Sequence, residues 1–162
     1  MKCSMEWERL FKLDENIKIK IEHEISRIDK SLDSVKPLLD LCKLKEPDII
    51  EMMAAAQVLH SFYNGVESII ILMFKNMNEK LPNDLKWHKT LFEMIFGKNS
   101  KNIKIINDEI KNKLERYLLF RHLIRHSYGT ELDWNEMGPL VNEVVDVWEI
   151  IKNDFKILIN NN

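Results

Sequence analysis

The sequence contains few of the residues that tight turns and disulfide frameworks need. Only 4 glycines and 4 prolines occur among the 162 residues, which disfavours a turn-rich β fold. The 2 cysteines, Cys3 and Cys42, are too few for a disulfide framework and lack the spacing of a zinc site. These absences predict an all-α fold in a reducing compartment, and we expect a cytoplasmic protein.

Long hydrophobic runs and a strong net charge are also absent. The richest apolar run, residues 66–74, is interrupted by Glu67 and is shorter than the roughly 20 residues that cross a bilayer. Residues 1–13 mix charged and aromatic residues, unlike a signal peptide. The formal net charge of −2 argues against a non-specific nucleic-acid coat protein, although a local basic patch can still bind phosphate. We expect no membrane association and a single helical domain over residues 1–162.

Helical periodicity is what the sequence has instead. Over residues 5–35, isoleucine, leucine and valine recur at steps of three and four, which predicts a long amphipathic helix that Pro37 kinks or ends. A second helix is predicted to start at Pro47, with Asp48 and Glu51 in its first turn, where the helix dipole favours acidic residues. This helix, which we expect to reach Met77, is apolar around most of its circumference and is therefore the central one.

Two more helices are predicted in the second half of the chain. A loop over residues 78–86 precedes a short helix over residues 87–95, which Gly97 ends. The next helix starts near residue 105 or 107 and ends near Tyr128.

The start of the last helix is ambiguous in the sequence. Asp133 and Glu136 have the spacing of a capping box. Because Pro139 follows, either a short turn precedes a helix that begins at Gly138, or the first turns are distorted. With this helix included, the sequence predicts an antiparallel bundle of four to five helices.

A polar line interrupts the predicted central helix. His60, Asn64 and Glu67 follow one another at spacings of four and three residues, so they lie on one side of the helix. Polar groups inside a bundle must be hydrogen-bonded, which makes this line either a structural network or the floor of a site.

Arginine and histidine concentrate in residues 120–128. No acidic residue occurs from residue 118 to residue 130, so these side chains have no carboxylate nearby in the sequence. On a helix the polar side chains share an arc of about 140°. We expect this arc to form an outward-facing positive surface, made of Arg121, His122, Arg125 and His126. The opposite side, expected to be buried, carries Leu119, Phe120, Leu123 and Ile124.

A second copy of the chain would bring this surface together into a site. Arg121 and His126 are five residues apart, or about 140° around a helix, so one rigid helix places them poorly around a single group. Across a two-fold axis, the arginine of each chain comes near the histidine of the other. An imidazole can then take the proton of a ribose 2′-hydroxyl, and a guanidinium can stabilise charge on the phosphorus.

Two alternative interpretations of the same residues remain. Arg121 and His126 can form a polar cluster that only stabilises a dimer. His122 and His126, four residues apart, also have the spacing of two metal ligands. The adjacent arginines would repel a divalent cation, and no acidic third ligand is near, so we expect no metal.

The residues Arg121-His122-Leu123-Ile124-Arg125-His126-Ser127-Tyr128 resemble the R-x4-H-x-Y motif of HepT-like ribonuclease toxins in the HEPN helical superfamily. The segment Trp87-His88-x-x-Leu91 is similar to one branch of these proteins, as are residues 131–133. The resemblance spans roughly Gln57 to the C-terminus. It implies a HEPN-like bundle that forms homodimers through the motif-bearing helix.

The resemblance also implies a function. It suggests the toxin of a type VII-like toxin–antitoxin pair: a metal-independent endoribonuclease that needs no cofactor, cleaves single-stranded RNA, and is paired with a minimal nucleotidyltransferase antitoxin. That antitoxin would transfer AMP to Tyr128 and so place phosphate beside the cations. Arg121 would stabilise the phosphate, and His126 would act as general acid or base. Because His122 and Arg125 share the arc of Arg121 and His126, we expect supporting roles for them as well. We also expect Asn64 and Glu67 to hold Arg121 in place.

A rival interpretation comes from a different class of protein. A non-catalytic helical adaptor could bind the nucleotidyltransferase, or a nucleotide, without cleaving RNA. For Tyr128 a plain packing role also remains open, while His23, His60 and His88 are expected to be structural.

Overall fold

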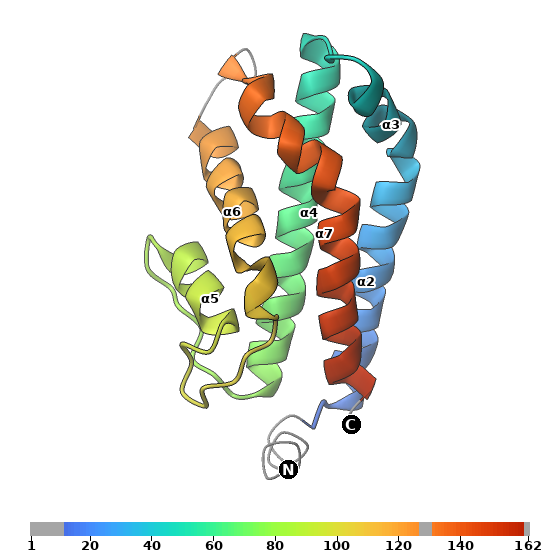
Figure 1. The fold of residues 1–162 in the computed structure, drawn as a ribbon. Coiled ribbons are helices and arrows are strands. Elements are labelled where there is room, and N and C mark those ends of the chain that lie inside the picture. The colour runs from blue at the N-terminus through green and yellow to red at the C-terminus, as the bar shows by residue number, and fades with distance from the viewer. Residues whose placement is uncertain (1–11, 127–130, 161–162) are drawn as a thin grey trace.

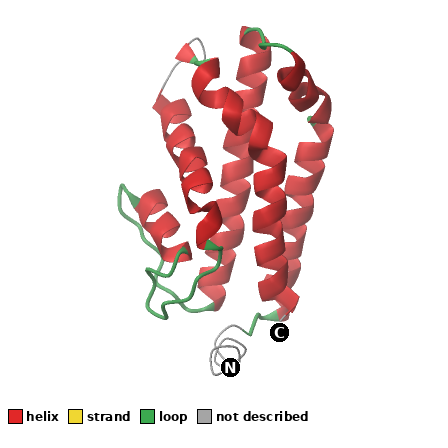
Figure 2. Ribbon diagram, in the orientation of Figure 1, coloured by secondary structure: helices red, strands yellow, loops and turns green. Residues whose placement is uncertain are grey.

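Helices form nearly all of the regular structure in this chain. A computed structural model describes residues 12–126 and 131–160. Figure 2 shows helices joined by loops over these residues, and the β-type pairing found among them is an isolated bridge between Phe96 and Lys104. The all-α prediction is confirmed.

Four long helices form an antiparallel bundle (Figure 1). They are α2 (Glu15–Ser34), α4 (Ile49–Asn76), α6 (Lys111–His126) and α7 (Trp134–Asn160). Successive long helices run in opposite directions, and α4 contacts α2, α6 and α7. The shorter α3 (Lys36–Leu44) lies at one end of the bundle, whereas α5 (Trp87–Ile95) and the 3-10 helix η1 (Asp108–Ile110) lie beside or below α6.

The helix α4 is the central element, as predicted. Its buried side chains pack against several neighbouring helices. They include Leu59, Phe62, Val66, Ile69, Met73 and Phe74. Phe62 also makes edge contacts with the rings of Tyr117 in α6 and Trp148 in α7.

Among the described helices, none has the length and apolar character that a membrane span requires.

Local capping interactions set where α2 and α4 begin. The helix α2 starts at Glu15, because the Asp14 side chain accepts the N–H of Asn16 at 2.9 Å and caps the helix. Residues 5–11, where the predicted helix began, lie outside the described residues. The N-cap of α4 is Asp48, so Pro47 precedes the helix instead of opening it. Asp48 and Glu51 form a reciprocal capping box, each accepting the other's backbone N–H at 2.8 Å.

Two prolines lie close to helix starts. The helix α2 ends at Ser34, and Pro37 occupies the first turn of α3, where its missing N–H costs no helical hydrogen bond. The last helix begins at Trp134 and includes Pro139, which resolves the ambiguity of its start. Asp133 accepts the N–H of Asn135 at 2.9 Å and so caps this helix.

The capping box at the start of α4 predicts a measurable contribution to stability. Replacing Asp48 by Ala leaves the Glu51 N–H without its partner and should lower the free energy of unfolding by about 1 kcal/mol in urea titrations. Asp48→Asn keeps an acceptor and should lose less. Glu46→Ala, at an exposed neighbouring position outside the helix, is the control. Equal stability of Asp48→Ala and Glu46→Ala would contradict this role.

Candidate active site

The orientation of α6 differs from the orientation predicted from the sequence. Arg121 was expected on the outward surface, but it is only 8% exposed and its side chain points toward α4. Leu119 and Leu123 were expected to be buried, yet they are 61% and 44% exposed. The side of α6 that faces the bundle contains Leu114, Tyr117, Leu118, Phe120 and Arg121.

Partners on other helices account for this orientation. The Tyr117 hydroxyl, one turn before Arg121, donates a buried hydrogen bond of 2.8 Å to the Leu140 carbonyl of α7. Arg121 itself meets the polar line of α4. A buried guanidinium is tolerated only when it is paired, and these partners are far from Arg121 in the sequence. Local spacing on α6 therefore could not identify its inward face.

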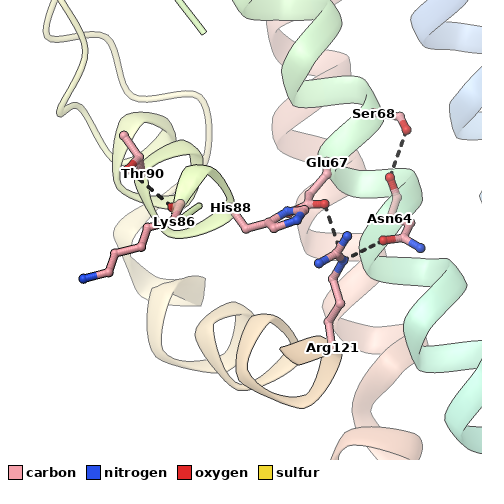
Figure 3. Close-up of polar contacts among 7 residues, drawn as sticks. All are labelled: Asn64, Glu67, Ser68, Lys86, His88, Thr90 and Arg121. Atoms are coloured by element: carbon pink, nitrogen blue, oxygen red, sulfur yellow. Dashed lines mark hydrogen bonds and ion pairs between the residues drawn. The ribbon is translucent and has the colours of Figure 1, made fainter. Parts of the chain in front are cut away.

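Arg121 is held by two side chains of the central helix (Figure 3). Its Nε donates to Asn64 Oδ1 at 2.7 Å and lies 3.6 Å from Glu67 Oε2. The backbone carbonyl of Asn64 separately accepts the Ser68 hydroxyl at 2.9 Å. The neutral amide supplies a directional hydrogen bond, and the carboxylate supplies the opposite charge.

His88 extends this network to a third helix. Its Nδ1 lies 2.7 Å from Glu67 Oε1, and both residues are buried. The Trp87 ring packs against the His88 ring at a tilt of 33°, with centroids 3.4 Å apart. From the sequence, His88 was expected to be a structural residue that caps a helix or packs. The adjacent Trp87-His88 pair was the available signal, but the contact with Glu67 could not be inferred from it.

Burial shifts the pKa values of Glu67 and His88 in opposite directions. Loss of solvation raises the pKa of Glu67 from 4.5 to about 7, although Arg121 and Arg125 oppose the shift. Loss of solvation, together with Arg121, Arg125 and His122, lowers the pKa of His88 from 6.5 to about 4. His88 is therefore neutral at pH 7, while Glu67 changes its charge near that pH.

Three buried nitrogen atoms near this network have no hydrogen-bond partner within the part of the chain that the structure describes. They are Arg121 Nη1, His88 Nε2 and His60 Nδ1. Burial and the charges of Arg121 and Arg125 lower the pKa of His60, which indicates that it also faces the arginines. Unpaired buried polar atoms are uncommon in folded proteins.

The other predicted site residues lie on the exposed side of α6. His122, Arg125 and His126 are all exposed at its C-terminal end. The rings of His122 and His126 meet edge to face, with centroids 5.9 Å apart. In the described residues no group of three His, Cys, Asp or Glu side chains is placed to hold a metal ion. Tyr128 lies outside the described residues.

The geometry defines a helical protein in which Arg121 is fixed inside the bundle. Beside it lies an exposed Arg/His surface, made of His122, Arg125 and His126. Comparison with family models gives one match, described as HepT-like protein, over residues 54–161. Because this match covers most of the chain, the protein belongs to the HepT-like family of the HEPN superfamily, a family that is generally of the ribonuclease type. No curated protein and no solved structure matches the chain in the other two comparisons.

The opposite pKa shifts predict opposite pH dependences in two variants. In the folded protein Glu67 keeps its proton up to about pH 7, so its contribution to stability falls as pH rises from 4.5 to 7. The folded protein binds no proton at His88 above about pH 4, so the contribution of His88 rises between pH 4 and 6.5. In the wild type these two contributions largely cancel.

Each substitution removes one of the two contributions. Relative to wild type, Glu67→Gln should become more stable as pH rises from 4.5 to 6.5, and His88→Leu should become less stable, each by roughly 2–3 kcal/mol. Urea unfolding at several pH values measures both differences. Parallel pH profiles for the two variants and the wild type would be inconsistent with the shifted pKa values.

Proposed function

We propose that this protein is the toxin of a type VII-like toxin–antitoxin pair and a metal-independent endoribonuclease that cleaves single-stranded RNA. The observation that carries the proposal is the buried Arg121, whose Nε is fixed by Asn64 at 2.7 Å and whose charge is balanced by Glu67. A guanidinium fixed before substrate arrives needs little reorganisation to stabilise charge on a phosphate. Family membership over residues 54–161 supports the same reaction class.

A homodimer through α6 would complete the site. Leu119, His122, Leu123 and His126 follow at helical spacings and are all exposed, so they form one face with an apolar centre. A second copy packed on this face would bury both leucines and bring the histidine of each chain toward the arginines of the other. We propose that residues 1–162 form one domain in each copy, since α2 and α3 pack on the helices of the matched region.

In the proposed reaction His126 removes the proton of a ribose 2′-hydroxyl. The resulting oxygen attacks the adjacent phosphorus, and the bond to the 5′-oxygen of the next nucleotide breaks. Arg121 stabilises the added negative charge, while the exposed His122 and Arg125 attract the phosphate. The second copy's His126 protonates the leaving oxygen, so the step requires no metal or cofactor.

The proposed antitoxin is a minimal nucleotidyltransferase that transfers AMP to Tyr128. Tyr128 follows His126 by two residues in the sequence. An added AMP phosphate would compete with RNA for Arg125 and the neighbouring cationic side chains.

RNA cleavage by the purified protein in EDTA tests the reaction. His126→Ala should reduce the cleavage rate by about 10²- to 10⁴-fold because the proton acceptor is removed, while the dimer persists in light scattering. His23→Ala replaces an exposed histidine of α2 and should cleave like the wild type. Undiminished cleavage by His126→Ala would exclude His126 as the general base.

The dimer face gives an independent prediction. Leu119→Asp places a charge in the apolar part of the proposed contact and should convert the protein to a monomer that does not cleave RNA. Ile150→Asp is the matched control, since Ile150 is a similarly exposed apolar residue on α7. If Leu119→Asp remained dimeric and active, the two copies would have to associate through another surface.

One observation favours a second candidate function. Because Arg121 is only 8% exposed, its role can be purely structural, with the exposed Arg/His face serving as a docking surface for the nucleotidyltransferase. Under this adaptor function the purified protein would bind its partner but cleave no RNA.

A further inference from the structure

We propose that His88 is a positioning residue for Arg121, acting through Glu67. Its Nδ1 hydrogen bond fixes the Glu67 carboxylate so that the other carboxylate oxygen remains beside the guanidinium. The proposal deepens the proposed ribonuclease function and rests on it, because Arg121 is the group that would stabilise the phosphate.

The contacts form a chain across three helices. His88 Nδ1 on α5 lies 2.7 Å from Glu67 Oε1 on α4, and Glu67 Oε2 lies 3.6 Å from Arg121 Nε on α6. The two oxygens of one carboxylate are therefore divided between an imidazole and a guanidinium. All three side chains are buried, so each contact acts with little competition from water.

A packing role alone does not account for this arrangement. A residue that only fills space needs the right volume, whereas His88 directs one particular ring nitrogen at a carboxylate oxygen. Asn64 already binds Arg121 Nε, but it carries no charge and cannot balance the buried cation. Only Glu67 supplies that charge within this network, and His88 sets the angle at which its carboxylate is presented.

The hydrogen bond from His88 also favours the ionised form of Glu67. Neutral His88 can donate through Nδ1, and a donated hydrogen bond stabilises the carboxylate. The other groups that face Glu67 are Tyr63 on α4 itself and Arg121 and Arg125 on α6. Since burial raises the pKa of Glu67 to about 7, losing the donor should keep Glu67 protonated at neutral pH. Arg121 would then lose its counter-charge.

Matched substitutions at position 88 separate donation from packing. In His88→Asn, the side-chain amide can place an N–H close to the position of Nδ1. His88→Leu preserves volume but removes the donor. Thr90→Ala lies on the exposed side of the same helix, where the hydroxyl makes only a 3.4 Å contact with the Lys86 carbonyl, and is the control.

Two measurements are made on each variant. The first is the pH dependence of kcat/KM for RNA cleavage in EDTA. The second is an NMR titration of the Arg121 Nε–H resonance, which senses the charge of Glu67 and does not depend on RNA cleavage. For His88→Leu we expect the midpoint of the titration to move to higher pH, and kcat/KM at pH 7 to fall roughly 10- to 100-fold. His88→Asn and Thr90→Ala should resemble the wild type in both.

The two measurements keep this inference separate from the proposed function. If the wild type cleaves no RNA but the titration midpoint moves in His88→Leu alone, the positioning of Arg121 stands and the ribonuclease proposal fails. An unmoved midpoint in His88→Leu would overturn the positioning role. Equal losses in His88→Leu and His88→Asn would overturn it as well, because they would indicate packing.

Discussion

The buried charge of Arg121 is the constraint on which the arrangement of this bundle depends. An unpaired guanidinium in a helical core would cost several kcal/mol, so α4 must present both Asn64 and Glu67 where α6 crosses it. The carboxylate is itself buried and takes its second partner, His88, from α5. One cation thereby connects three helices, and its charge offsets only part of the cost of burying Glu67, whose pKa still rises to about 7.

The same pairing decides which surface the protein presents. With Arg121 turned toward α4, the rotation of α6 leaves Leu119 and Leu123 exposed beside His122 and His126. These exposed leucines and histidines share the face through which we propose that two copies associate. The interior network and the proposed contact between copies are thus two consequences of a single helix orientation. In this HepT-like protein, the orientation of α6 would therefore link the stability of the bundle to the geometry of the proposed reaction.

Much of the fold could be predicted because helices have strong local signals. The periodic apolar residues of α2, the apolar circumference of α4 and Gly97 after α5 each indicate an element within a short window of sequence. The start of α4 was misplaced, and the start of α7 was left open, where local rules compete. Pro47 is a good first helical residue, but Asp48 forms the capping box and so becomes the boundary. Pro139 lies inside the first turns of α7, where the preceding cap at Asp133 starts the helix upstream of it.

Composition and periodicity were enough to predict the helical class, the central helix and the cluster of arginine and histidine, because they are properties of neighbouring residues. Periodicity also placed Asn64 and Glu67 on one side of their helix, since residues three apart share a face. The inward direction of Arg121 and the contact of His88 with Glu67, 21 residues away, could be seen only in the folded chain. Both depend on the desolvation of charges between helices, and that cost is set by partners which are distant in sequence and close only after folding.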